Sequence, residues 1–545
     1  MKRWTTVLIL AAGQFVMVLD SSVMNVSISQ LVADLHTSVA NIQLAITLYT
    51  LVMASLMLTG GKLGDVLGRR RAFVVGLGIY GLGSLLTALA PNLTVLIIGW
   101  SVIEGLGAIL VIPAIMALTA TSYEGNDRGL AYGVLGGIAA AGVAVGPLIG
   151  GWVTSNLSWR YVFVAESALV VVLMISARSI PDAPRSTRRD PLDGVGILLS
   201  AAGLGAAVFA ILRSSAWGWI QPRRPPQLGE RSVTPFGFAP TVPLIVIGAG
   251  FLVAFVAWER HRQEHHKSVL LRLDLLASPV TRAGLATLLM QQLLLAGTFF
   301  VMPLYLQVVL GLDAFHSGMK LLPLSLTMFV SALGAARLGA SVSPRRLVRI
   351  GLMMVGGAQL MLLAVIDDEL RSRPFALSLA VLGVGVGLLA SQLGNVILSS
   401  VDERYSSEAG GLQGTAQNLG ASLGTAFVGA ILLGGLASGF QHEVSQSTTL
   451  PAEIREAAMD RSEGGLEFVA SSVVRDLTKQ AKLEPASADA IVSSYAASQL
   501  AALKSALGVV ALVVAVAFMC TRQIPDKPLT AKSDGDSVSQ AAASP

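Results

Sequence analysis

Long apolar stretches separated by short charged segments recur along the whole chain. A bilayer core needs roughly 20 apolar residues per helix, and by that measure the pattern predicts fourteen membrane-spanning helices. A count of twelve stays open if the pair 194–213 and 240–258 lies at the membrane interface. The expected spans are residues 5–27, 40–60, 72–91, 93–119, 129–153, 160–178, 194–213, 240–258, 281–310, 315–338, 347–366, 375–399, 409–436 and 500–521.

The order of these spans predicts an all-α polytopic membrane protein of two six-helix bundles with two helices inserted between them. Residues 1–178 would form the first bundle, and residues 179–280 the inserted pair with its linkers. Residues 281–521 would form the second bundle, including a mostly polar extracellular insert at 437–499. Residues 522–545, rich in Ser, Ala and Asp, are typical of a disordered cytoplasmic tail.

A charged segment at residues 61–71 has a weaker copy at residues 336–346. Each copy lies between two apolar spans, and the two share a Leu-Gly pair and two consecutive arginines at matching positions. A charged segment repeated at the same place in two apolar halves indicates a duplicated membrane domain.

Composition narrows the class further. The chain is 53% hydrophobic and 13% charged, with a mean hydropathy of +0.68, whereas soluble proteins carry about 25% charged residues. The basic residues lie in short loops, which favours cytoplasmic termini and does not indicate nucleic-acid binding. The single cysteine, Cys520, excludes an internal disulfide. With no nucleotide-binding, metalloprotease or hydrolase motif, we expect no enzyme activity, no ATP use, no metal site and no cofactor.

The charged segment at residues 61–71 resembles the main signature of the major facilitator superfamily, although Val66 replaces its usual basic residue. The resemblance implies the major facilitator fold, with Asp65 facing the start of the span at 409–436, where a carboxylate stabilises the positive end of a helix dipole. The arginines would add contacts to a cytoplasmic gate; a plain cluster of positive charge is the alternative. The matching positions are Gly61, Asp65, Gly68, Arg69 and Arg70.

Asp20 lies inside the first apolar span. Because an ionised carboxylate at mid-bilayer costs about 2.5–3.5 kcal/mol, Asp20 is expected to face a cavity or a partner and to bind and release a proton there. Residues 19–28, with Asn25 among the matches and Ser22 in place of threonine, resemble a signature of the fourteen-span drug:proton antiporters, the EmrB/QacA-like group. The alternative is a structural carboxylate that is hydrogen-bonded to neighbouring helices.

Two more acidic residues fall inside predicted spans. The family usually has an arginine where this chain has Ser101, and Glu104 lies three residues later on nearly the same helix face. Glu104 is therefore expected to be a second protonation site or to attract a cationic substrate. Glu166, where the family more often has asparagine, is the third candidate. Each could instead be a bonded structural group.

The fifth span carries small residues four positions apart, which let helices pack closely, and a proline, which kinks a helix. The segment resembles the antiporter signature that is typical of exporters in the superfamily. Tight packing alone would explain the glycines, so the outward direction of transport depends on the resemblance. The matching positions are Gly142, Gly146, Pro147, Gly150 and Gly151.

Polar residues in the spans of the second half are mostly amides. With neighbouring Met, Phe and Leu residues they could line an apolar cavity that suits hydrophobic ligands, although each alone is more often an interhelical hydrogen-bond donor. With Asn25 of the first span, the candidates are Gln291, Gln292, Tyr305, Gln392, Asn395 and Gln417.

Together these features predict a proton-coupled antiporter in a bacterial plasma membrane. Its expected substrates are small hydrophobic compounds, including cationic drugs, and its expected energy source is the proton gradient. One alternative is an exporter of a self-made metabolite, siderophore or lipid with the same fold. A membrane sensor that does not transport is the other.

Overall fold

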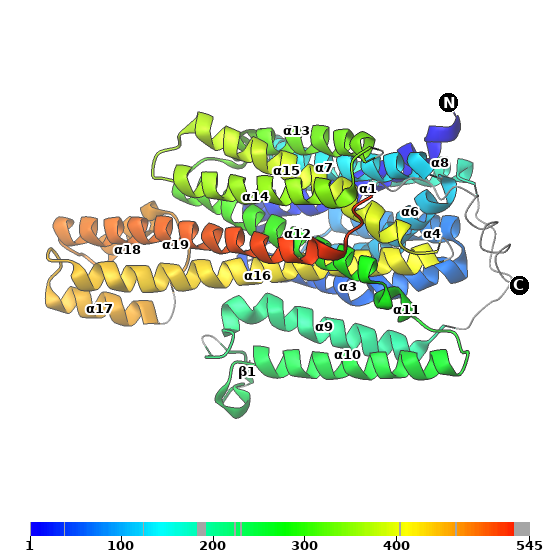
Figure 1. Ribbon diagram of the computed structural model, residues 1–545. Coiled ribbons are helices and arrows are strands. Elements are labelled where there is room, and N and C mark those ends of the chain that lie inside the picture. The colour runs from blue at the N-terminus through cyan, green and yellow to red at the C-terminus, as the bar shows by residue number, and fades with distance from the viewer. Residues whose placement is uncertain are drawn as a thin grey trace, which may run out of the picture.

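The computed structural model describes residues 2–37, 39–123, 125–181, 192–222, 225–228, 231–339, 341–402, 405–463 and 466–527. Fourteen helices in these ranges are long and apolar enough to cross a membrane. They include both helices of the inserted pair, so the fourteen-span prediction is confirmed and the twelve-span alternative is not. The predicted fold class, an all-α polytopic membrane protein, is confirmed as well (Figure 1).

Six spans form the first bundle around an apolar core of their own. The short helices α2 (Ile28–Asp34), α5 (Leu93–Leu96) and η2 (Ala177–Ser179) connect them. The six spans are α1 (Lys2–Val26), α3 (Val39–Leu67), α4 (Arg69–Ala88), the continuous η1 and α6 (Ile97–Glu104 and Gly105–Ser122), α7 (Gly125–Asn156) and α8 (Arg160–Ser176).

Six later spans form the second bundle around a separate core. The two bundles meet along two seams, α3 against α16 and α7 against α13. The short helix α11 (Asp274–Ala277) precedes this bundle. Its spans are α12 with η4 (Pro279–Pro303 and Leu304–Val309), α13 (Ala314–Leu338), α14 (Pro344–Val365), α15 (Ser372–Ser399), α16 (Ser406–Gln446) and α19 (Pro485–Cys520).

The inserted pair, α9 (Gly194–Trp217) and α10 (Thr241–Glu264), forms a helical hairpin beside the bundles (Figure 1). The connection between them contains the antiparallel strands β1 (Gln227–Leu228) and β2 (Arg231–Ser232) and the short helix η3 (Pro235–Gly237). Helix α9 packs on both α3 and α16, and Leu204 and Phe255 join the core of the second bundle. The inserted pair therefore lies over a seam between the bundles.

Helices α16 and α19 extend far beyond the predicted spans at 409–436 and 500–521. Helix α16 has 41 residues and is about 60 Å long, roughly twice the thickness of a bilayer core. The two helices project together, with α17 (Ala452–Glu463) and α18 (Ser471–Gln480) between their ends (Figure 1). Much of the segment 437–499 is therefore an extension of these two helices, because polar residues alone do not end a helix outside the apolar layer.

The first residues of the predicted tail contact the second copy of the charged segment. After η6 (Thr521–Gln523), Arg345 Nε donates a hydrogen bond of 2.7 Å to the Ile524 carbonyl oxygen, and Arg345 lies 3.5 Å from the Asp526 carboxylate. The rest of the predicted tail, residues 528–545, lies outside the described residues.

Glycine permits the closest helix contacts in the first bundle, and one of them gives a stability prediction. A Cβ on Gly107 of α6 would lie 2.5 Å from the backbone nitrogen of Tyr80 on α4. Since backbone atoms cannot move aside cheaply, we expect Gly107→Ala to destabilise the protein by about 1–3 kcal/mol. A thermal-shift measurement on the purified protein in detergent should show a lower Tm.

The matched control is Gly357→Ala on α14, where an added Cβ would meet no atom within 4 Å. This variant should keep the wild-type Tm or raise it slightly, because alanine is the better helix former. Equal Tm values for the two variants would contradict the close packing of α4 against α6.

Candidate functional site

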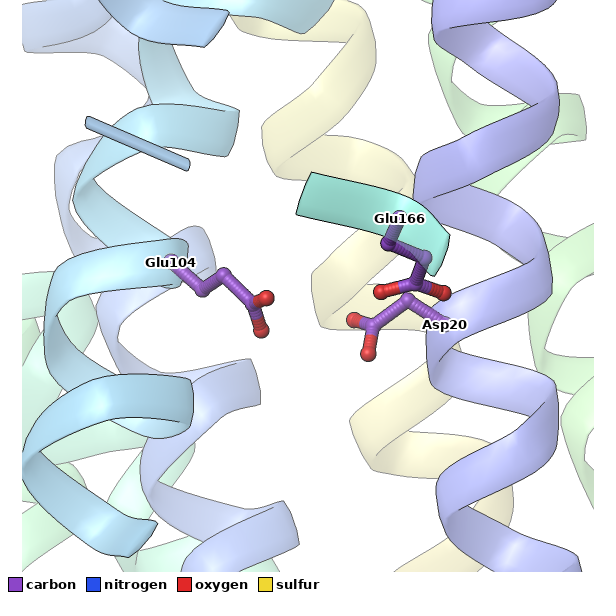
Figure 2. A group of neighbouring side chains, drawn as sticks. All are labelled: Asp20, Glu104 and Glu166. Carbon is purple, nitrogen blue, oxygen red and sulfur yellow. The ribbon is translucent and has the colours of Figure 1, made fainter. Parts of the chain in front are cut away.

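The structure brings the three predicted acidic residues together. Asp20 on α1, Glu104 at the end of η1 and Glu166 on α8 each place a carboxylate oxygen within 4.8 Å of the others. All three side chains are buried, with exposed fractions of 0%, 0% and 3%. Figure 2 shows Asp20 and Glu166 side by side, with Glu104 directed toward them. We call these residues the carboxylate cluster.

The members of the carboxylate cluster differ in their hydrogen bonds. The Trp100 indole N–H lies 2.9 and 3.0 Å from the two carboxylate oxygens of Asp20 and donates to them. The Ser84 hydroxyl lies 3.3 Å from Glu166 and 3.1 Å from the Phe163 carbonyl oxygen. Neither oxygen of Glu104 has a hydrogen-bond partner among the described residues. Asp20 is therefore the member best suited to carry a negative charge.

Trp100 and Glu104 are four positions apart and lie on the same side of their helix, as they would in an α-helix. Residues Ile97–Glu104 form a π-helix, a wider turn that often occurs at functional sites. The Ser101 side chain faces α3, because its hydroxyl donates a hydrogen bond of 2.8 Å to the Ala45 carbonyl oxygen on that helix. The sequence analysis placed Ser101 and Glu104 on nearly the same helix face and overlooked Trp100, although Trp100 lies one turn before Glu104. The signal available was an indole, which needs a hydrogen-bond partner when buried.

Electrostatic repulsion limits the charge that this site can hold. Two unit charges 4.8 Å apart repel by about 3.5 kcal/mol at an effective dielectric constant of roughly 20. Three ionised carboxylates would then cost about 10 kcal/mol, which is as large as the whole stability of a typical domain. The cluster must therefore hold a proton or another cation on at least one carboxylate.

The donor set suits a proton better than a metal ion. Three carboxylates could in principle hold a hard cation, but Ca²⁺ takes six to eight oxygen ligands and Mg²⁺ demands octahedral geometry. The Trp100 N–H is directed at both Asp20 oxygens and takes up part of their capacity to accept, which would weaken the binding of a metal ion by Asp20. A proton shared among the carboxylates therefore fits the site better than a metal ion does.

The glycines of the predicted antiporter signature bring α7 against α1 on both sides of Asp20. An added Cβ would lie 3.0 Å from Val18 at Gly142, in contact with Ser22 at Gly146, and 2.9 Å from Val23 at Gly150. The small residues of α7 thus fix the position of the helix that carries Asp20. Gly151 is buried, while Pro147 and Asn25 lie outside the residues whose side chains are described.

The charged segment at residues 61–71 is helical except at one residue. Helix α3 continues through Leu67, and α4 begins at Arg69. The only break is Gly68, whose φ of 93° lies in the region that favours glycine. Gly61 is a buried residue inside α3. We call the end of the molecule that carries this break the Gly68 end.

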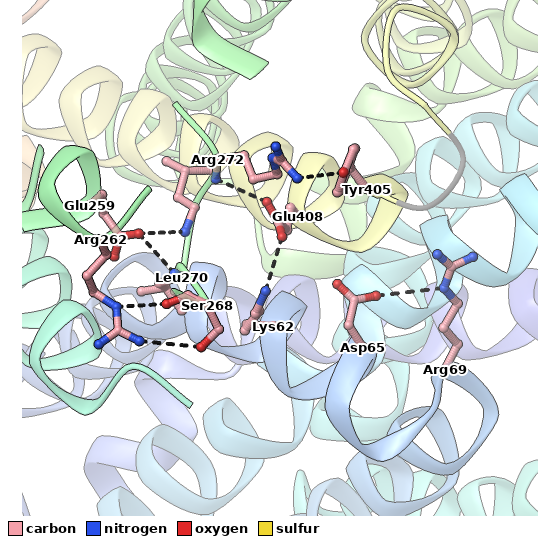
Figure 3. A network of polar contacts seen from close by, with 11 residues as sticks. Lys62, Asp65, Arg69, Glu259, Arg262, Ser268, Leu270, Arg272, Tyr405 and Glu408 are labelled. Atoms are coloured by element: carbon pink, nitrogen blue, oxygen red, sulfur yellow. Dashed lines mark hydrogen bonds and ion pairs between the residues drawn. The ribbon is translucent and has the colours of Figure 1, made fainter. Parts of the chain in front are cut away.

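Asp65 lies beside the first turn of α16, as Figure 3 shows, and 3.9 Å from Arg69. The bond across the seam comes from Lys62, whose ammonium group lies 3.3 Å from the Glu408 carboxylate. Arg69 and Arg70 donate to the carbonyl oxygens of Ala117 and Ile180, inside the first bundle. The sequence analysis assigned the gate contact to the arginines and overlooked Lys62 and Glu408.

The polar residues predicted to line a substrate cavity are spread over the second bundle. Gln291 faces a small internal cavity between α12, α14 and α15, together with Gln359. The Tyr305 hydroxyl donates a hydrogen bond of 2.9 Å to the Asp367 carbonyl oxygen, and the Gln392 amide donates one of 3.0 Å to the Ala335 carbonyl oxygen. The remaining candidates are the partly buried Gln292, Asn395 and Gln417. Gln392 thus bonds another helix and Tyr305 the loop after α14, and the described contacts do not bring the group into one cavity.

Comparison with known proteins shows extended similarity. Residues 10–425 match the family model of the Major Facilitator Superfamily. The chain is 30% identical over 459 residues to the puromycin resistance protein pur8 of Streptomyces alboniger, which covers 83% of this chain and 86% of that protein. It is also 27% identical over 462 residues to the tetracenomycin C resistance and export protein of Streptomyces glaucescens, and the aligned part covers 84% of this chain and 81% of that protein. The human organic anion transporter MFSD10 has a similar fold, with a TM-score of 0.57 and 12% identity over 96% of this chain and 98% of that chain.

The unpartnered carboxyl group of Glu104 gives a second stability prediction. Because Glu104→Gln keeps the shape and removes one ionisable group from a crowded site, we expect it to raise the free energy of unfolding by about 1–3 kcal/mol. The measurement is the Tm of the purified variant at pH 8. The control is Glu453→Gln on α17, an exposed position, which should leave the Tm unchanged. A lower Tm for Glu104→Gln would show that this carboxyl group has a stabilising partner.

Proposed function

The chain belongs to the Major Facilitator Superfamily and is a multi-pass membrane transporter with fourteen spans, and we propose that it exports hydrophobic compounds in exchange for protons. The carboxylate cluster carries this proposal, since three buried acidic groups within 4.8 Å of one another cannot all be ionised. A transporter that gains and loses a proton at such a site can use the proton gradient. The proposal includes no ATP and no cofactor.

The position of the carboxylate cluster supports a proton as its ligand. The cluster lies inside the first bundle, enclosed by α1, α4, η1 and α8, and its side chains are almost completely buried. A proton can reach such a site through a thin file of water, whereas a drug molecule would have to separate four packed helices. The substrate therefore binds elsewhere and competes with the proton through a change of conformation.

The packing of α1 offers a route for that change. Asp20 lies between the positions where α1 contacts Gly142, Gly146 and Gly150 of α7. Helix α7 in turn packs on α13 of the second bundle. A shift of α1 on protonation of Asp20 would therefore reach the seam between the bundles, which have separate cores and can move as bodies.

The names of the relatives guide the choice of substrates. One is a puromycin resistance protein and another a resistance and export protein for tetracenomycin C. We propose bulky, largely apolar compounds of this kind as substrates, moved outward across a bacterial plasma membrane. In this orientation the Gly68 end and both termini face the cytoplasm, in agreement with the basic residues of the charged segments.

The test is substrate-induced proton release in everted membrane vesicles, with puromycin, tetracenomycin C and a set of lipophilic cations. The wild type should release protons from an acidified lumen when a substrate is added. Asp20→Asn should abolish the release, because the charge-carrying member of the cluster is lost. Glu104→Gln and Glu166→Gln should reduce it at least about tenfold, since a cluster with fewer protons to exchange transmits less of the gradient.

The control is Glu453→Gln, which removes an exposed carboxylate remote from the cluster and should release protons like the wild type. Undiminished release in all three cluster variants would contradict the assignment of proton coupling to this site. Substrate accumulation in wild-type vesicles without any proton release would contradict antiport itself.

A further inference from the structure

The inserted pair is bonded to the linker that follows it, residues 265–273. The Arg262 guanidinium donates 2.7 Å to the Ser268 carbonyl oxygen. The Glu259 carboxylate, fully buried, accepts hydrogen bonds from the backbone N–H groups of Leu270 and Leu271 at 3.0 and 3.4 Å. The C-terminal end of α10 thus holds the linker in one conformation (Figure 3).

The same linker ends on the first turn of α16. The backbone N–H of Arg272 donates a hydrogen bond of 3.1 Å to Glu408 Oε2, and the Arg272 guanidinium donates one of 2.6 Å to the Tyr405 hydroxyl. Glu408 Oε1 accepts from the Lys62 ammonium group of α3 at 3.3 Å. One buried carboxylate therefore receives the linker on one oxygen and the first bundle on the other (Figure 3).

A second set of contacts fixes the inserted pair itself. Asp193 caps the N-terminus of α9 by accepting a hydrogen bond of 3.1 Å from the Gly196 N–H. Its carboxylate also accepts a hydrogen bond of 2.9 Å from the Trp258 indole N–H of α10. Arg262 lies 3.3 Å from the same carboxylate. Helix α9 then packs on both α3 and α16, with Gly205 opposite Ser55. The pair is a braced unit that touches both sides of the seam.

We propose that α9, α10 and the linker 265–273 form a latch that holds the α3–α16 seam closed at the cytoplasmic side, with Glu259 as the positioning residue and Glu408 as the point of attachment. The proposal rests on the proposed transport function, in which the bundles must separate at this seam in each cycle. Separation breaks the Lys62–Glu408 bond, and the latch makes this step less favourable by fixing Glu408 from the other side. Two helices that merely filled space beside the bundles would need no such bonds.

The rate of disulfide formation between the two bundles measures how often they are in contact, and this measurement does not require a transported substrate. In a Cys520→Ser background, one pair is Met116→Cys on α6 with Gly410→Cys on α16, two helices that meet beside the α3–α16 seam. An added Cβ on Gly410 lies 3.3 Å from the Met116 Cβ. The other is Gly137→Cys with Leu333→Cys on the α7–α13 seam, where an added Cβ on Gly137 lies 3.5 Å from Leu333 Cγ. The Cβ atoms of the first pair are almost in contact, and those of the second are at most about 5 Å apart because Leu333 Cγ is one C–C bond from Cβ, so both pairs are close enough to be oxidised to a disulfide in the closed state. The readout is the rate of cross-linking by copper phenanthroline.

Glu259→Ala and Glu408→Gln should each slow cross-linking at both pairs by about threefold or more, because the closed state loses population. The double variant should be no slower than Glu408→Gln alone, since Glu259 acts through Glu408. The matched control is Glu264→Ala, an exposed glutamate on the same helix, which should cross-link like the wild type. Gly196→Ala is a second variant that tests the latch, and it changes no charged residue. The added Cβ would lie 2.5 Å from Glu259 Oε1 and would therefore displace the Glu259 carboxylate.

Wild-type rates at both pairs in Glu259→Ala and Gly196→Ala would overturn the latch. Slower cross-linking at the Met116–Gly410 pair alone would also overturn it, since that result means only a local displacement of the first turn of α16. The proposed transport function is judged separately: if Glu259→Ala slows both pairs but no substrate releases protons, the latch stands and proton-coupled export is wrong.

Discussion

The central constraint on this molecule is that a carboxylate cannot remain ionised and unpaired in an apolar layer. Asp20, Glu104 and Glu166 meet inside one bundle, where among the described residues the Trp100 indole N–H donates to Asp20 and the Ser84 hydroxyl to Glu166. That is too few donors for three negative charges, so the site is stable only with a proton bound. Much of the first bundle maintains this arrangement: the π-helix that carries Trp100 and Glu104, and the glycines that hold α1 against α7.

The carboxylate cluster and the α3–α16 seam at the Gly68 end differ in their chemistry. The carboxylate cluster is buried, and its three acidic groups cannot all be ionised. The seam at the Gly68 end depends on a few bonds between charged groups, with Lys62 and Glu408 at its centre. The glycines of α7 hold the helix of Asp20, and α7 packs on α13 at the other seam between the two bundles. Proton binding and seam opening can thus be linked without any contact between the two sites.

The sequence predicted the fold and the acidic residues but not their arrangement. Apolar length predicted all fourteen spans, since the bilayer core fixes the length of each helix. The cost of burying charge singled out Asp20, Glu104 and Glu166. Two partners were missed. Trp100 lies one turn before Glu104 on the same helix face, so its buried indole could have been found from the sequence. Glu408 could not, because it meets Lys62 only after residues 346 positions apart are brought together. The ends of α16 and α19 were also missed, because outside the membrane hydropathy no longer marks where a helix stops.

Infrared difference spectroscopy on the purified protein tests the central claim most directly, because a protonated carboxyl group has its own carbonyl stretching band. Addition of a substrate at fixed pH should remove intensity from this band in the wild type, as the cluster gives up a proton. In Glu104→Gln, which lacks the carboxyl group without hydrogen-bond donors, the loss should be absent or much smaller. An unchanged band loss in Glu104→Gln, Asp20→Asn and Glu166→Gln would mean that the proton exchanged for substrate is held elsewhere, and the account of this site would be wrong.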